Sequence, residues 1–173
     1  YFLDLYAKHV VPFVDTYAYS LLRNHFHIAI RVKEKEEIRN LTGLRDLSDL
    51  TDRLPSQKFA NLFNAYAKSI NKSYSRSGAL FERPFGRKLV TSEAYLFHLI
   101  KYIHFNPQKH GFVANFREWQ HSSWQTLISS SPTKLAREEV LKLFGGLEVF
   151  EKEHAYEVID NDFLSNFIGE DLD

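Results

Sequence analysis

Two histidines separated by one residue, His25 and His27, lie in a segment whose side chains alternate between polar and apolar. This alternation predicts a β-strand over 25–33 and places both imidazoles on one face of it. Their Cα atoms would then lie roughly 7 Å apart, which lets both rings bind one divalent metal and leaves positions for a further ligand. The pattern also occurs by chance, so by itself it leaves a plain polar strand face open.

A tyrosine with polar neighbours lies on a second predicted element, a helix over 92–106 that begins at Ser92. Tyr102 lies about 110° from the centre of the apolar stripe of this helix. His98 and Asn106 are four residues before and after it, so the three side chains form one row. The row would offer a phenol, an imidazole and an amide to a substrate. The alternative is a tyrosine that covers the edge of the core.

Together these groups would suit phosphoryl transfer to a tyrosine. A phenol with a pKa near 10 is a weak nucleophile and needs a base or a metal. A divalent ion bound by the histidines would polarise the phosphoryl group under attack. The tyrosine would then hold the phosphate as an ester and release a 3′ hydroxyl, so the bond energy is kept for rejoining. This chemistry is that of a DNA strand transferase.

The remaining elements follow from hydrophobic periodicity. We expect a helix end over 1–10, a strand over 14–22, a tight turn at Arg23-Asn24 and an exposed, mobile connection over 34–55. Further along, the chain predicts the following elements: a helix over 56–74 capped by Ser56, a strand over 86–91, an end of the 92–106 helix at Pro107, and helices over about 134–144 and 147–156.

Composition restricts the class of protein. The chain has 173 residues, of which 44% are hydrophobic and 25% charged, as in ordinary globular domains. It has no cysteine, which excludes a disulfide framework, a cysteine zinc site and a thiol nucleophile. No apolar run approaches the length of a membrane span, so we expect a cytoplasmic protein without a membrane partner. Methionine is also absent, so we expect that the natural chain begins upstream of residue 1.

The net charge of zero conceals a basic middle and an acidic tail. Residues 54–113 contain 9 Lys and Arg against 2 acids, whereas residues 114–173 contain 5 against 12. The basic middle is either a nucleic-acid surface or a solvated face that pairs with the tail. The candidate nucleic-acid-binding residues are Arg76, Arg83, Arg87, Lys88 and Lys109.

Four ordered segments resemble a known family. Asn24-His25-Phe26-His27 is similar to the His-hydrophobic-His motif of the single-tyrosine HUH transposases. The run from Tyr102 to Gly111, YIHFNPQKHG, resembles the Y-I-x-x-N-P-x-x-x-G segment of one branch, the REP-associated tyrosine transposases. The run GALFERPF at 78–85 resembles the G-x-L-[FW]-x-x-x-F stretch between them, and Trp119 with Ser122-Ser123-Trp124 resembles the segment that follows.

This resemblance implies a site and a fold. It implies that Tyr102 is the nucleophile, that His25, His27 and Asn106 hold Mg²⁺ or Mn²⁺, and that the substrate is single-stranded DNA beside a hairpin. His98 is a possible auxiliary group. The implied fold is α+β, a ferredoxin-like antiparallel sheet packed with helices, whose first strand is missing from this chain. The implied domains are a catalytic domain over 1–128 and an acidic helical extension over 129–173.

The chain departs from the family in two places: Arg23 replaces the usual proline before Asn24-His25, and the first strand is absent. The main alternative function is therefore a catalytically inactive single-strand binder of the same fold, which uses the basic residues together with Phe81 and Phe85. A two-histidine phosphoesterase needs two H-x-[ST] motifs, and only His121-Ser122-Ser123 fits. The oligomeric state, monomer or homodimer, stays open.

Overall fold

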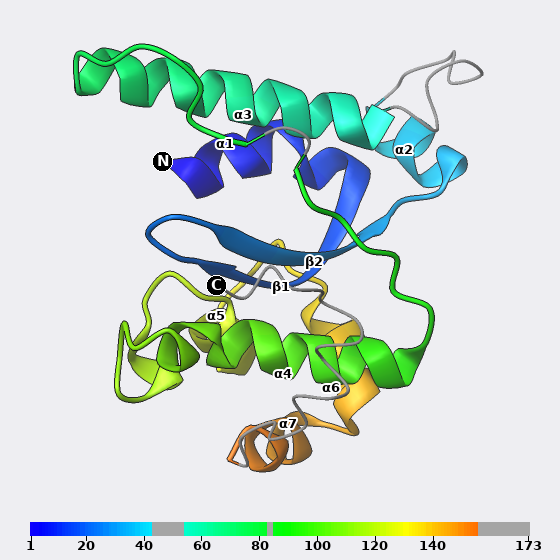
Figure 1. Cartoon of the computed structure of the whole chain (residues 1–173). Helices are drawn as coiled ribbons and strands as arrows, with labels where there is room; N and C mark the ends of the chain where they lie inside the picture. Colours follow the sequence, from blue (N-terminus) through cyan, green and yellow to red (C-terminus); the bar gives the residue numbers. More distant parts are fainter. Residues whose placement is uncertain (43–53, 83–84, 156–173) are drawn as a thin grey trace. The chain divides into compact units, whose positions relative to one another are not determined.

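The structure is a computed structural model that describes residues 1–42, 54–82 and 85–155. It is α+β, as expected: a two-stranded antiparallel sheet is combined with seven α-helices among the described residues (Figure 1). The chain divides into two compact units. The first unit contains residues 1–15 and 31–87, and the second contains residues 16–30 and those from 88 onward.

The sheet is the predicted hairpin. Strand β1 spans Val14–Leu21 and strand β2 spans Phe26–Val32. The turn between them contains Arg23 and Asn24, and the Leu22 N–H donates to the His25 carbonyl at 2.9 Å. Both strands form because alternate side chains are buried along β1 and because β-branched and aromatic residues dominate the two segments.

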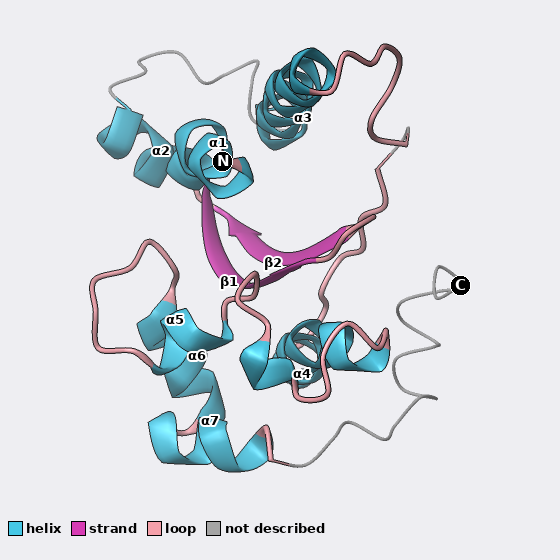
Figure 2. Cartoon of the chain, turned by 90° about the vertical axis from the view of Figure 1, so that its left-hand side faces the viewer, coloured by secondary structure: helices cyan, strands magenta, loops and turns pink. Residues whose placement is uncertain are grey.

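In the first unit, α1 (Phe2–His9) packs beside α3 (Leu54–Ser73) (Figures 1 and 2). Tyr6 and Phe59 are buried there, and their ring centroids lie 6.2 Å apart. Both helices were predicted, but α3 begins two residues before Ser56. Instead of capping this helix, the Ser56 hydroxyl accepts a hydrogen bond from Arg87 at 2.8 Å.

A helix forms where an exposed, mobile connection was expected. The segment α2 (Lys35–Thr42) is helical, so that part of the prediction for 34–55 is wrong. Ile38 is buried, with 3% of its surface exposed, and the Glu37 carboxylate accepts the Glu34 N–H at 2.7 Å at the helix start. One buried apolar residue and a satisfied first turn therefore stabilise a helix in a mostly polar sequence. Residues 43–53 lie outside the described part of the chain.

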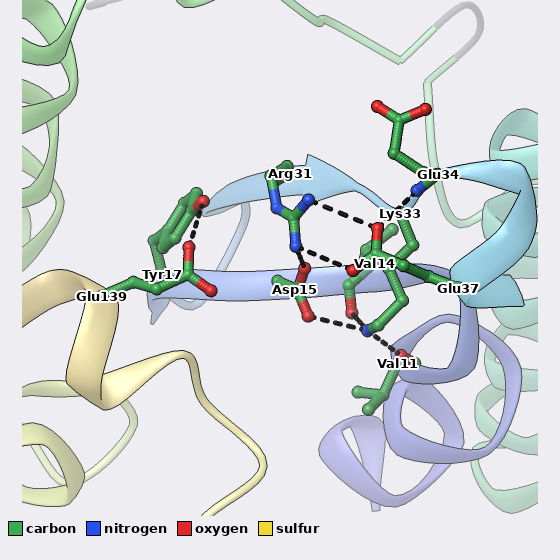
Figure 3. A network of polar contacts seen from close by, with 9 residues as sticks. All are labelled: Val11, Val14, Asp15, Tyr17, Arg31, Lys33, Glu34, Glu37 and Glu139. Carbon is green, nitrogen blue, oxygen red and sulfur yellow. Dashed lines mark hydrogen bonds and ion pairs between the residues drawn. The ribbon is translucent and has the colours of Figure 1, made fainter. Parts of the chain in front are cut away.

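Polar contacts connect the start of β1 and the end of β2, which both belong to the first unit, with α2 (Figure 3). Lys33 forms an ion pair with Asp15 at 2.8 Å and donates to the Val14 carbonyl at 2.6 Å. Arg31 contacts both Asp15 and Glu37, the latter at 3.2 Å. Because Lys33 and Asp15 are largely buried, these charges are satisfied by one another and by backbone carbonyls.

In the second unit, the long helix α4 spans Glu93–Lys109, and the Ser92 hydroxyl caps it by accepting the Tyr95 N–H, as predicted. The helix does not end at Pro107. It continues to Lys109, and a turn at Gly111 with a φ of +70° closes it. Pro107 has no N–H and therefore removes one hydrogen bond from the helix. The burial of the last turns outweighs the loss of this single bond.

The expected strand over 86–91 is not formed. These residues have no regular secondary structure, and Leu89 is 82% exposed. The edge of β1 that β2 leaves free is instead met by two isolated bridges, from Leu135 to Thr16 and from Ser122 to Ser20. Short bridges of this kind satisfy the backbone groups of β1 without a third strand.

Three further helices complete the second unit: α5 (Trp124–Ile128), α6 (Arg137–Phe144) and α7 (Leu147–Glu153). Two glycines with positive φ, Gly145 at +84° and Gly146 at +116°, connect α6 to α7. Phe144 and Phe150 then join the same buried cluster as Ile100 and Trp124. The helices expected over 134–144 and 147–156 are thus present, although α6 begins three residues later and α7 ends at Glu153. Residue 156 lies outside the described residues.

We expect Phe150→Ala to lower the free energy of unfolding by about 3 to 5 kcal/mol, because Phe150 is fully buried in this cluster. Chemical denaturation followed by fluorescence measures the change. Val149→Ala is the matched control, since Val149 lies beside it on α7 and is 40% exposed. A Phe150 variant whose free energy of unfolding equals that of the unchanged chain would contradict the prediction. That result would favour an extension over 129–173 that folds separately from residues 1–128; this division into domains stays a prediction.

Candidate functional site

The site residues of the sequence analysis meet in the second unit, where the start of β2 faces α4. The rings of His25 and His27 lie 5.1 Å apart between centroids and are inclined by 80°. The His27 ring lies 5.6 Å from the ring of Tyr102. The strand and the helix therefore bring both imidazoles and the phenol together.

Tyr102 is more buried than we expected of a residue in a polar row of the helix. Only 3% of its surface is exposed, and every residue of α4 from Ile100 to Pro107 is buried. Its hydroxyl has no hydrogen-bond partner among the described residues. Burial raises the pKa of the phenol above its ordinary value, so the hydroxyl is protonated at neutral pH.

Asn106 lies one turn further along α4 and is fully buried. Neither its side-chain oxygen nor its side-chain nitrogen has a hydrogen-bond partner among the described residues. The amide lies near both the Tyr102 hydroxyl and the His25 ring, but neither contact has hydrogen-bond geometry. An unpaired buried amide costs about 1 to 3 kcal/mol, and such a group calls for a functional explanation.

A third imidazole joins the pair, which the sequence analysis did not single out. His110 follows α4 directly, and its ring lies 5.2 Å from that of His25. Its position could not be predicted from the sequence, because the predicted helix ends at Pro107. In the structure α4 continues to Lys109, which brings His110, four residues after Asn106 and eight after Tyr102, to the side of the helix that carries those two residues. Beside it, the Lys109 ammonium lies 5.6 Å from the centre of the Tyr102 ring.

The imidazoles of the hairpin are held neutral. Burial lowers the pKa of His27 to about 4, and the nearby His25 and His110 contribute to this shift. Burial and His110 also lower the pKa of His25. A neutral imidazole keeps a nitrogen lone pair for a metal ion, so both rings are in the form that a ligand requires.

These residues fit a divalent metal. The donor set is two neutral imidazoles and an amide oxygen that lacks a partner, a mixture of nitrogen and oxygen ligands that can bind a divalent first-row metal ion. No group of three or more His, Cys, Asp or Glu side chains in the described parts of the chain is arranged to hold a metal ion. If the protein provides a third ligand beside His25 and His27, Asn106 is the side chain that would supply it.

The other candidates are distributed over both units. Arg76 and Arg87 belong to the first unit, and both are exposed. Lys88 and Lys109 belong to the second and are exposed as well. Arg83 lies outside the described residues. His98 is half-buried one turn before Tyr102, and its ring lies 5.3 Å from that of Phe97.

A basic residue of the middle segment 54–113 forms an ion pair with the acidic tail 114–173. Lys101 lies 3.5 Å from Glu153 of α7 and is itself buried. No helix of the described residues is long and apolar enough to cross a membrane.

Comparisons with known proteins support the resemblance. No protein-family model matches the chain, and no solved structure matches it. A curated protein of Haemophilus influenzae, named "Putative REP-associated tyrosine transposase", is 26% identical over 113 residues, which is 65% of this chain. The aligned part is 60% of that relative's length. The similarity confirms the resemblance carried by the four segments: this chain is similar to the REP-associated tyrosine transposases.

Proposed function

We propose that the chain is a transposase-like DNA strand transferase that cleaves and rejoins single-stranded DNA near hairpins. Tyr102 is the nucleophile, and the reaction passes through a covalent 5′-phosphotyrosine. The observation that carries this proposal is the meeting of His27, Tyr102 and the unpaired Asn106 amide in one place. The similarity to a curated protein that is named "Putative REP-associated tyrosine transposase" supports the same reaction class.

In this proposal His25, His27 and Asn106 hold Mg²⁺ or Mn²⁺. A divalent ion held there would supply Lewis acidity toward the phosphoryl group and its developing negative charge. The protein contributes the placement of the ligands. The hairpin fixes two rings in neutral form, and α4 carries the amide one turn beyond the tyrosine.

The Tyr102 oxygen forms a bond to phosphorus while the bond from phosphorus to the 3′ oxygen breaks. The phenol loses its proton, and the leaving oxygen ends as a 3′ hydroxyl, so the exchange of one phosphate ester for another is balanced. Lys109 favours this step because a cation near the ring stabilises the developing phenolate. His110 and Lys109 are exposed, so they are the side chains that DNA meets first beside the buried tyrosine.

The depth of Tyr102 favours a second candidate, a catalytically inactive binder of single-stranded DNA. A phenol that is 3% exposed and has a raised pKa is poorly placed to attack an incoming strand. In the first unit, Arg87 lies over the ring of Phe85 at 5.8 Å, an arrangement of cation and aromatic ring that also binds bases.

Replacement of Tyr102 by phenylalanine separates the two candidates. We expect Tyr102→Phe to lose all covalent DNA adduct, because the variant keeps the ring but lacks the nucleophilic oxygen. The assay incubates labelled hairpin-flanked oligonucleotides with Mn²⁺ or Mg²⁺ and resolves the products by denaturing electrophoresis. Tyr95→Phe, at another buried tyrosine of α4, is the control and should keep the adduct. Cleavage that persists in Tyr102→Phe would refute the nucleophile.

A second experiment concerns Asn106. We expect Asn106→Ala to weaken Mn²⁺ binding at least about tenfold, since it removes a ligand oxygen. In the absence of metal the same variant should be within about 1 kcal/mol of the unchanged chain in stability, because removal of the unpaired amide stabilises the fold while the cavity that it leaves destabilises it. Titration calorimetry and denaturation measure the two quantities. His121→Ala is the control, since His121 is exposed. Unchanged Mn²⁺ affinity would exclude Asn106 as a ligand.

The third experiment tests the basic residues. We expect the double variant Arg76→Gln/Arg87→Gln to bind single-stranded DNA more weakly, with a dependence on salt that is smaller by about 0.7 for each phosphate that an arginine no longer neutralises. Binding is measured by fluorescence anisotropy over a range of salt concentrations. Lys142→Gln on α6 is the matched control for the removal of a positive charge. An unchanged salt dependence in the double variant would mean that these two arginines do not bind phosphates.

A further inference from the structure

A chain of hydrogen bonds runs through the core of the second unit behind the candidate site. His104 of α4 lies between Ser123 and His154, with 2.8 Å from its Nε2 to the Ser123 Oγ and 2.9 Å from its Nδ1 to the His154 Nε2. The His154 Nδ1 lies 2.8 Å from the Phe150 carbonyl. All three polar side chains have no exposed surface.

The donor and the acceptor of every hydrogen bond in this series follow by elimination. A carbonyl oxygen only accepts, so the His154 Nδ1 carries the proton that it donates to Phe150. In a neutral His154 the Nε2 is then an acceptor, and the His104 Nδ1 must donate to it. The His104 Nε2 is left as an acceptor, so the Ser123 hydroxyl donates. Burial keeps both rings neutral, because it lowers the pKa of His154 to about 3 and that of His104 well below its usual range.

The chain reaches β1 at its serine end. The Tyr19 N–H donates to the Ser123 Oγ at 2.9 Å, and the Ser123 N–H donates to the Tyr19 carbonyl at 2.9 Å. One continuous set of bonds therefore joins β1, the residue before α5, the middle of α4 and the end of α7. Every group in it that donates has an acceptor.

His104 is placed to control how α4 is turned about its axis. It is two residues from both Tyr102 and Asn106, which is about 200° round a helix with 3.6 residues per turn. It therefore points away from the site while those two side chains point toward it. A bond network on the back of a helix fixes its rotation, and a rotation would move Tyr102 and Asn106 away from His25 and His27.

We propose that Ser123, His104 and His154 form a positioning chain that holds α4 in the rotation which presents Tyr102 and Asn106 to the histidine hairpin. The chain gives a role to His104 and Ser123, which lie in two of the segments that resemble the transposases, and to His154 of the acidic tail. What Tyr102 does when so held rests on the proposed function. The positioning itself is measured without activity.

Nuclear magnetic resonance of the full chain with ¹⁵N-labelled histidine tests the direction of the bonds. Both His104 and His154 should carry their proton on Nδ1 at neutral pH. In His154→Phe, we expect His104 to move its proton to Nε2 and donate to Ser123, whose hydroxyl then turns to the Tyr19 carbonyl 3.2 Å away. A purely packing role for His154 would leave the His104 tautomer unchanged. Should His154→Phe fail to fold, an Nε2–H proton on His104 in the unchanged chain would already overturn the proposal.

Hydrogen exchange tests the positioning. In Ser123→Ala, the backbone amides at 102–106 should exchange about tenfold faster, because His104 loses the hydroxyl that connects it to the Tyr19 N–H of β1. Ser122→Ala is the matched control: Ser122 is also buried, but its hydroxyl donates to the Trp119 carbonyl and does not contact His104. Equal exchange in the two variants would overturn the positioning role.

The same samples separate this proposal from the proposed function. An unchanged chain that forms no tyrosine adduct but has both Nδ1–H tautomers and the exchange difference would refute the transferase and support the positioning chain. An adduct at Tyr102 together with an Nε2–H proton on His104 would have the opposite meaning.

Discussion

The stretch of α4 from Ile100 to Pro107 is buried on all sides although it carries a histidine, a tyrosine and an asparagine within five residues. A buried polar group must be paired or must cost free energy, about 1 to 3 kcal/mol for each unpaired group. His104 is paired at both ring nitrogens, whereas the side chains of Tyr102 and Asn106 are unpaired among the described residues. The helix therefore has a satisfied side and an unsatisfied side, and the unsatisfied side faces the histidine hairpin.

This division separates what holds the fold from what could do chemistry. The satisfied side connects α4 to β1 and α7 through neutral rings, which need no counter-ion. The unsatisfied side offers an amide oxygen and two imidazole lone pairs, which a cation would satisfy better than apolar neighbours do. The unpaired groups of Asn106 and Tyr102 thus destabilise the fold, and the rest of the core offsets this cost. Functional sites commonly carry a cost of this kind.

The sequence predicted the elements whose signals are local. The alternation at 25–33 predicted β2 and the shared face of His25 and His27, and the helix predicted to begin at Ser92 is α4. Features that depend on tertiary packing were predicted wrongly. Pro107 indicated a helix end because its effect on isolated chains is strong, yet the core holds the last turn in place. The 86–91 segment has strand-like residues but pairs with no other strand.

The site was only partly accessible to sequence reasoning for the same cause. Spacing along one element placed Tyr102 and Asn106 in a row, but it could not show their burial, because burial depends on the hairpin and the other elements that pack round the helix. His154 had no local signal at all, since its partner His104 is 50 residues away. His110 lies beyond the helix end that Pro107 indicated, and its contact with His25 depends both on the continuation of α4 and on the hairpin.

The pair of glycines before α7 determines how freely this part of the sequence can vary. Gly145 has the left-handed conformation, which asparagine also tolerates. Gly146, with a φ of 116° and a ψ of 171°, is in a region that essentially only glycine occupies. A side chain at position 146 would redirect α7 and withdraw Phe150 and His154 together. In a saturation library of the chain, position 146 should therefore be among the least tolerant, although it is far along the sequence from Tyr102 and has no side chain of its own.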